Sequence, residues 1–170
     1  GGVGEGGEMN TNKIWYEIKS LNTREIVVNE ILVKTVGVLS FVILTTLGAY
    51  VWIPLPFTPV PITLQTFFVL LSGAVLGANL GALSQFGYLL FGGLGLPLFA
   101  GGTFGLSSLI GPTGGYLLGF VSASCLVGWL TGKGKTRYIN LFLIFVIASL
   151  VIYLLGASWL AIFLSLSLIH

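Results

Sequence analysis

Charged side chains are almost absent from this 170-residue chain. Asp, Glu, Lys and Arg together make up 7% of the residues, whereas apolar residues make up 55%. Soluble domains carry charge on about a quarter of their residues. No Asp, Glu, Lys, Arg or His occurs from residue 35 to 132 or from 138 to 169, so a soluble fold would have no charged surface there. The sequence therefore predicts an all-α, polytopic integral membrane protein.

Reactive side chains are equally scarce. The chain has one cysteine and one histidine, and every acidic residue precedes Ile31. Without a carboxylate in the bilayer there is no proton relay or ion-coupling site. Without a base, nucleophile or metal ligands there is no basis for an enzyme or a metal site, and we expect no cofactor and no nucleic-acid partner. A ligand-binding subunit driven by partners, or a small assembly protein, remains.

The apolar stretches, divided at turn residues, predict a bundle of five transmembrane helices. About 20 residues cross the hydrocarbon core. The second and third spans, joined by a tight turn at 77–79, should form an antiparallel helical hairpin. The last apolar run is longer than one crossing, so we expect it either to tilt steeply or to break near 156–158. The transmembrane domain is predicted over 35–170, with spans at about 35–53, 62–77, 80–96, 112–130 and 139–160.

Two segments precede the first predicted span. Residues 1–10 are rich in Gly and Glu and are predicted to be a disordered leader. In residues 11–34, apolar residues recur at helical spacing among polar ones, and Thr23 is a candidate N-cap. This pattern predicts a cytoplasmic amphipathic helix that lies on the membrane surface.

The basic residues predict the orientation of the chain. All seven lie in two groups, four at 13–34 before the first span and three at 133–137 after the fourth. An even number of spans separates the groups, so one orientation places both in the cytoplasm. The N-terminus is then cytoplasmic, and all six prolines lie in the two outer loops.

The first outer loop is the most constrained stretch of the chain. Residues 53–66 read I-P-L-P-F-T-P-V-P-I-T-L-Q-T. Each proline fixes its own φ and disfavours helix at the residue before it. We expect a stiff, extended loop that can act as a lid over a ligand, although such a loop can also be only a helix-breaking turn.

Glycine is concentrated in the second outer loop, residues 92–115. Glycine allows close backbone approach and positive φ, so this loop can turn its amides toward a small polar ligand. Gly115 and Gly119, with Ala123, instead form a small-x-x-x-small stripe that predicts close helix packing.

Two glutamines are neutral polar groups within the predicted spans. Gln65 and Gln85 are more typical of interhelical hydrogen bonds than of ligand contacts. Gln65 lies one turn below the proline-rich loop and is the better ligand candidate of the two.

Three motifs follow one another along the chain: P-F-T-P-V-P-I-T-L-Q-T at 56–66, G-L-P-L-F-A-G-G-T-F-G at 95–105 and G-P-T-G-G-Y-L-L-G-F at 111–120. In this order and at these separations they resemble the BioY family, the biotin-specific substrate-binding S components of energy-coupling-factor (ECF) transporters. The resemblance implies a six-helix bundle in a prokaryotic cell membrane that captures biotin from outside. It also implies two kinds of partner, a transmembrane coupling subunit and two cytoplasmic ATPases.

The resemblance implies a binding site as well. Biotin has a ureido ring with two donors and one acceptor, an apolar thiophane ring and tail, and a carboxylate. Backbone amides, threonine hydroxyls and apolar side chains such as Phe57 suit the first two parts. The family's polar position after the Gly-Gly pair falls on Thr103. The predicted ligand-binding residues are Thr58, Pro59, Pro61, Thr63, Gln65, Phe99, Gly101, Gly102, Thr103, Thr113 and Tyr116.

The chain departs from the family pattern in two places. The Ala-x-x-x-Ala coupling motif has Thr45-x-x-x-Ala49 as its nearest equivalent, so these two residues are the predicted partner-docking positions. The sixth helix of the family opens with Pro-Gly-Asp-x-x-Lys, which contacts biotin, and this motif is absent from the 170 residues. Because a carboxylate in an apolar pocket needs a cation or several donors, we expect a truncated form that binds biotin weakly.

Two other functions stay open at this point. The chain could be a non-transporting scaffold or assembly protein of the membrane, or an S component for a different small vitamin.

The predicted orientation can be tested with single cysteines introduced at Thr58 and at Gly134. An impermeant thiol reagent applied to intact cells should label the cysteine at 58 and leave the one at 134 unlabelled. The opposite pattern would contradict the predicted orientation.

Overall fold

The computed structural model describes residues 11–132 and 137–167. The predicted leader and two of the basic residues, Lys133 and Lys135, lie outside the described residues. The elements are α1 (Thr11–Tyr50), β1 (Trp52–Ile53), β2 (Ile62–Thr63), α2 (Gln65–Leu76), α3 (Ala78–Gly93), the 3-10 turn η1 (Ala100–Gly102), α4 (Leu106–Ile110), α5 (Gly114–Thr131) and α6 (Tyr138–Ser167).

Contacts divide the chain into residues 1–36 and residues 37–170. In the first unit, residues 11–36 are helical throughout and belong to α1. Thr23 is therefore inside a helix, where its hydroxyl donates to the Lys19 carbonyl at 2.7 Å, and its prediction as an N-cap is wrong. The residues before Thr23 are already helical, so no helix begins at this position. The surface location of this segment stays a prediction.

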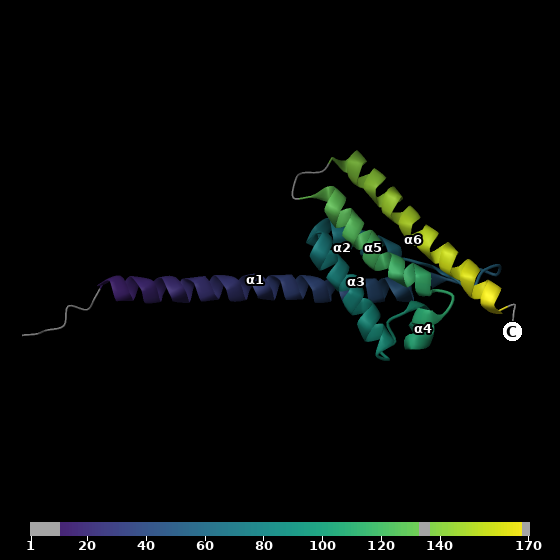
Figure 1. The fold of residues 1–170 in the computed structure, drawn as a ribbon, viewed down its shortest axis with the longest axis horizontal. Coiled ribbons are helices and arrows are strands. Elements are labelled where there is room, and N and C mark those ends of the chain that lie inside the picture. The colour runs from purple at the N-terminus through teal and green to yellow at the C-terminus, as the bar shows by residue number, and fades with distance from the viewer. Residues whose placement is uncertain (1–10, 133–136, 168–170) are drawn as a thin grey trace, which may run out of the picture. The chain divides into compact units, whose positions relative to one another are not determined.

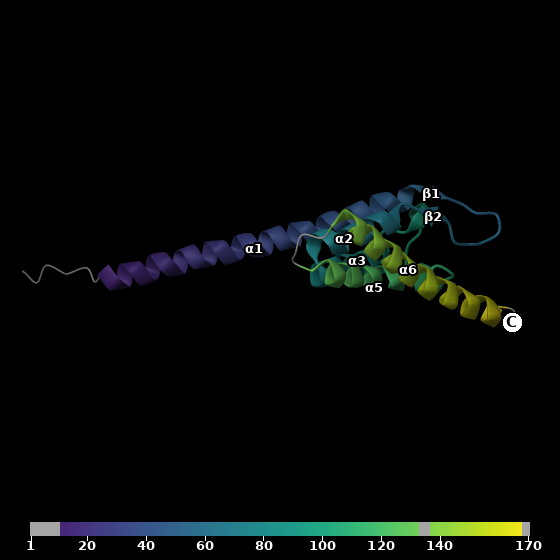
Figure 2. The same ribbon diagram turned by 90° about the horizontal axis from the view of Figure 1, so that it is seen from above.

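Helix α5 is the centre of the second unit. It packs against α6, α2 and α3, and Figures 1 and 2 both show α5 and α6 side by side. The backbones approach closely, because a Cβ at Gly115 would come within 2.6 Å of the Leu155 carbonyl oxygen and one at Gly119 within 3.0 Å of Ile152 Cα. The predicted packing role of these glycines is confirmed.

The predicted helical hairpin is formed by α2 and α3. Gly77, with φ of 83°, makes the turn between them, and Gly81 then packs against the backbone of Gly73. A Cβ at Gly128 of α5 would overlap the backbone of Ala78. Small residues therefore let α2, α3 and α5 pack closely together near the turn at Gly77.

A network of buried polar side chains joins four helices in the interior. Gln85 Nε2 lies within hydrogen-bond distance of the hydroxyls of Ser72 at 3.1 Å, Ser84 at 3.2 Å and Thr45 at 3.3 Å. The hydroxyls of Ser72 and Ser124 lie 2.8 Å apart. All five side chains are fully buried, so the predicted interhelical role of Gln85 is confirmed. Such bonds link helices where water is excluded.

Three helices of the described chain are long and apolar enough to cross a membrane, namely Glu25–Tyr50, Gly114–Thr131 and Tyr138–Leu166. The hairpin helices are shorter, with 12 residues in α2 and 16 in α3. Helix α6 runs unbroken through Gly156, whose backbone packs under the Tyr116 ring. Of the two alternatives for the last apolar run, the break near 156–158 is therefore wrong.

The close approach of α5 and α6 predicts that two Gly-to-Ala substitutions differ in their effect on stability. Gly115→Ala should lower the free energy of unfolding by about 1–3 kcal/mol, because the added methyl forces α5 and α6 apart. Gly87→Ala, in α3, is the matched control, because its Cβ would meet only Val42 Cγ2 at an ordinary 3.6 Å. It should leave stability unchanged or raise it by up to about 1 kcal/mol.

Thermal unfolding of both variants in detergent measures the difference. Equal melting temperatures for the two variants would contradict the packing that we describe.

Candidate ligand-binding site

The proline-rich loop is the closed end of a short β-hairpin. β1 pairs antiparallel with β2, with Trp52 opposite Thr63 and Ile53 opposite Ile62. One further bond, from Leu64 N to the Val51 carbonyl at 3.1 Å, fixes the base of the hairpin. The prolines thus lie within a loop whose two ends are held together, and the loop is more than a helix-breaking turn.

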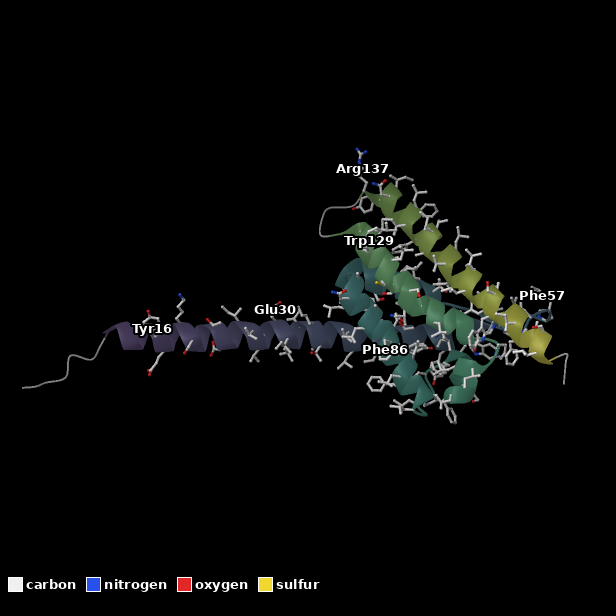
Figure 3. All side chains as sticks on the ribbon, viewed as in Figure 1. Tyr16, Glu30, Phe57, Phe86, Trp129 and Arg137 are labelled. Atoms are coloured by element: carbon white, nitrogen blue, oxygen red, sulfur yellow. The ribbon has the colours of Figure 1, made fainter. Side chains whose placement is uncertain are left out.

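Within the hairpin loop, one predicted residue faces inward and another does not. Thr58 lines the cavity described below, and its Oγ1 accepts a bond from Val60 N at 3.3 Å. Phe57 is 81% exposed, and its side chain is labelled in Figure 3. Phe57 is not among the residues that line the cavity, and its contact with a ligand stays a prediction.

The second wall is the glycine-rich segment between α3 and α5. Gly101 and Gly102 have φ of 68° and 75°, the left-handed region that favours glycine. The turn is closed by bonds from Gly102 N to the Phe99 carbonyl at 2.9 Å and from Phe99 N to the Thr103 carbonyl at 3.1 Å. The Thr103 hydroxyl donates to the Ala100 carbonyl at 3.1 Å.

Phe99 anchors this wall in the core. Its side chain is 2% exposed, and its ring meets Tyr88 edge to face with centroids 5.4 Å apart. Gly92 leaves the space that the ring fills, because a Cβ there would overlap the ring. The buried Phe99 ring thus anchors this part of the second loop in the helical bundle.

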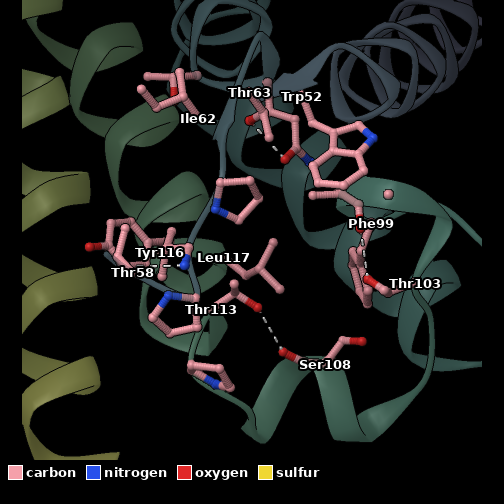
Figure 4. Close-up of a pocket in the computed structure, with 18 of the residues that line it drawn as sticks. Trp52, Thr58, Ile62, Thr63, Phe99, Thr103, Ser108, Thr113, Tyr116 and Leu117 are labelled. Carbon is pink, nitrogen blue, oxygen red and sulfur yellow. Dashed lines mark hydrogen bonds between the residues drawn. The ribbon is translucent and has the colours of Figure 1, made fainter. Parts of the chain in front are cut away.

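A cavity of about 800 Å³ lies between the two walls. Figure 4 shows residues of the hairpin together with Thr103 of the second loop, Ser108 of α4 and Thr113, which directly precedes α5. None of the described lining residues carries a charge. The cavity offers hydroxyls, amides, backbone groups and apolar surface, which suits a small uncharged polar group joined to an apolar body.

The structure brings together every predicted ligand-binding residue except Gly102. Gly102 faces Tyr50 instead, whose Cε1 would lie 3.9 Å from an added Cβ. Contact with a ligand stays a prediction for all of them. The predicted residues that line the cavity are Thr58, Pro59, Pro61, Thr63, Gln65, Phe99, Gly101, Thr103, Thr113 and Tyr116.

Several lining residues were missed by the sequence analysis. The adjacent serines Ser107 and Ser108 lie between the second and third motifs, where a polar pair in an apolar loop is a usable signal. Ile152 and Tyr153 come from α6 and give no local signal, because only the packing of α6 on α5 brings them to the cavity. The missed residues are Trp52, Pro54, Leu55, Val60, Ile62, Thr66, Ala100, Ser107, Ser108, Pro112, Leu117, Phe120, Ile152 and Tyr153.

Gln65 lines the cavity, but its amide is used within the protein. The side chain is 3% exposed. Its Oε1 accepts from the Thr63 hydroxyl at 3.0 Å, and its Nε2 donates to the Tyr88 hydroxyl. Gln65 therefore connects the hairpin to α3, and this internal role accounts for its buried position.

The predicted docking residues lie in the interior of this structure, and docking of a partner there stays a prediction. Thr45 and Ala49 are both fully buried. Thr45 belongs to the polar network around Gln85, so the face of α1 that carries these residues packs against the rest of the bundle. Neither side chain is presented to a partner in this structure.

Comparisons with known proteins agree on one family. A model of the BioY family matches residues 18–170. A probable biotin transporter BioY of Pyrococcus horikoshii is 46% identical over 121 residues, which cover 71% of this chain and 70% of that protein. A biotin transporter BioY of Thermotoga maritima is 47% identical over 96 residues, or 56% of each chain.

A solved structure supports the same assignment. The crystal structure of the S-component for biotin from an ECF-type ABC transporter matches with a TM-score of 0.72 and 25% identity. The match covers 79% of this chain and 74% of that one. Because the family model matches most of the chain, and a relative above 30% identity agrees over more than two thirds of it, this chain belongs to the BioY family.

Proposed function

We propose that this chain captures biotin as the substrate-binding S component of an ECF transporter. It binds a ligand and is not an enzyme. The observation that carries the proposal is the uncharged cavity between the hairpin and the second loop, formed by the three motifs that resemble the family. Relatives named as biotin transporters supply the identity of the ligand.

The hydroxyls around the cavity complement a ureido ring. Thr103 and Thr113 donate their protons to backbone carbonyls, those of Ala100 and Ser108, so their oxygens remain available as acceptors for the two ureido N–H groups. Thr58 is the reverse case, because its oxygen accepts from Val60 N and its proton is left for the ureido carbonyl. Two acceptors and one donor match the ring.

The remaining surface suits the apolar parts of biotin. Leu117 and Phe120 of α5 and Ile152 of α6 form an apolar wall. Pro59 and Pro61 contribute stiff apolar surface from the hairpin, whose ordering costs little entropy because proline has few conformations to lose. Burial of the thiophane ring and the alkyl tail against these groups contributes to binding in proportion to the apolar area removed from water.

We further propose a five-span arrangement with the N-terminus in the cytoplasm of a prokaryotic cell. The basic groups on either side of an even number of spans support this orientation. A transmembrane coupling subunit and two ATPases would supply the energy, because the chain contains no nucleotide-binding motif. Docking of the coupling subunit at positions 45 and 49, which are buried in this structure, stays a prediction.

The test is equilibrium binding of labelled biotin to the purified chain in lipid nanodiscs. Unlabelled biotin should displace the label, and riboflavin or thiamine should not. Absence of saturable biotin binding, or equal displacement by another vitamin, would contradict the assignment of biotin.

Thr103→Ala locates the site. Removal of an acceptor from a partly enclosed ligand group should weaken binding by about 5- to 150-fold, because the loss of one such bond costs about 1–3 kcal/mol. Thr46→Ala is the matched control, since this hydroxyl also donates to a nearby backbone carbonyl, that of Val42 at 2.8 Å, but does not line the cavity. Equal affinities of the two variants would place the ligand elsewhere.

A further inference from the structure

Two tyrosine hydroxyls donate hydrogen bonds to the backbone carbonyls of adjacent residues in the second loop. Tyr50, the last residue of α1, donates its hydroxyl to the Pro97 carbonyl at 2.6 Å. Tyr88, in the middle of α3, donates to the Leu98 carbonyl at 3.0 Å. Neither tyrosine lines the cavity. Both bond to the segment directly before Phe99. Phe99 itself lines the cavity.

Tyr88 also reaches the opposite wall of the cavity. Its hydroxyl accepts from Gln65 Nε2, and Gln65 Oε1 accepts from Thr63 of β2. Its ring packs edge to face against Phe99. A fully buried side chain outside the cavity is therefore connected both to the hairpin and to the second loop.

The second loop depends on such ties because its own backbone is permissive. Gly95, Gly101, Gly102 and Gly105 all have positive φ. Glycine loses more conformational freedom on ordering than any other residue, so the unrestrained loop would sample many shapes. Only a fraction of the unliganded molecules then has a site in the binding shape, and the apparent affinity falls in proportion to this competent fraction.

We propose that Tyr88 is a positioning residue for ligand binding, and that it holds both walls of the cavity in their binding shape while Tyr50 assists at the neighbouring carbonyl. The inference rests on the proposed function for the identity of the ligand. It concerns residues that meet no ligand atom and that act by ordering the site before the ligand arrives.

Tyr88→Phe tests the proposal in the full chain in nanodiscs, because it keeps the ring against Phe99 and removes only the hydroxyl. The affinity for biotin should fall about 5- to 10-fold. The loss should lie mainly in the association rate constant, since fewer unoccupied molecules have a competent site. Tyr138→Phe is the matched control, because Tyr138 is 93% exposed, and it should bind as the parent does.

A second measurement needs no ligand. A spin label on Leu96→Cys, in a Cys125→Ala background, reports the mobility of the second loop. Leu96 is 51% exposed and outside the cavity. Tyr88→Phe should increase the label's motion in the unliganded protein, and saturating biotin should reverse the increase. A purely structural role would lower the melting temperature and leave the label's motion and the association rate unchanged.

The outcomes separate this inference from the proposed function. If the parent does not bind biotin, the proposed function fails, and the label's mobility still decides whether Tyr88 orders the loop. If the parent binds and Tyr88→Phe matches Tyr138→Phe in rate and mobility, the inference is overturned. Should Tyr88→Phe fail to fold, Tyr50→Phe removes the neighbouring tie from a half-exposed position and should show the same changes at smaller size.

Discussion

Backbone polar groups away from water must find partners inside the protein, and this requirement shapes the candidate site. Helices satisfy the requirement internally, but the two loops that form the cavity cannot. The hairpin meets it partly by lacking donors, because its prolines have no N–H, and partly by pairing β1 with β2. The second loop meets it with short turns and with two tyrosine hydroxyls that donate to adjacent carbonyls.

The helices beneath the loops are held by close backbone approach and by buried hydroxyls and amides. Gly115 and Gly119 let α6 lie against α5, which brings Ile152 to the wall of the cavity. Gln85 connects α1, α2 and α3 through hydroxyl groups that have no contact with water. Close packing at small residues and buried interhelical hydrogen bonds are typical of membrane proteins, because the hydrophobic effect contributes little to helix association in lipid. A rigid base of this kind allows an uncharged cavity to keep its shape.

Much of the site could be predicted from the sequence, because its residues lie in short contiguous motifs. Prolines at 54–61 exclude helix by local sterics, and the glycine cluster at 101–102 requires positive φ for the same kind of reason. Helix existence was likewise predictable from apolar runs. The small-residue stripe of α5 follows from its four-residue spacing.

Features that depend on distant packing could not be predicted. The strand pairing of Trp52 with Thr63 requires the loop to close on itself, and Tyr153 reaches the cavity only through the docking of α6. Thr45 matched a docking motif by spacing, yet spacing does not say which face of a helix is buried. Thr23 has the chemistry of an N-cap, but the residues before it continue the helix.

The central claim is that biotin occupies the cavity between the hairpin and the second loop. An experimental structure of the chain with biotin bound tests it most directly. We expect ligand density enclosed by Thr58, Thr103 and Thr113, with the ureido ring on these hydroxyls and the tail along Leu117 and Ile152. Biotin bound at any other position, with this cavity empty or closed, would contradict the account.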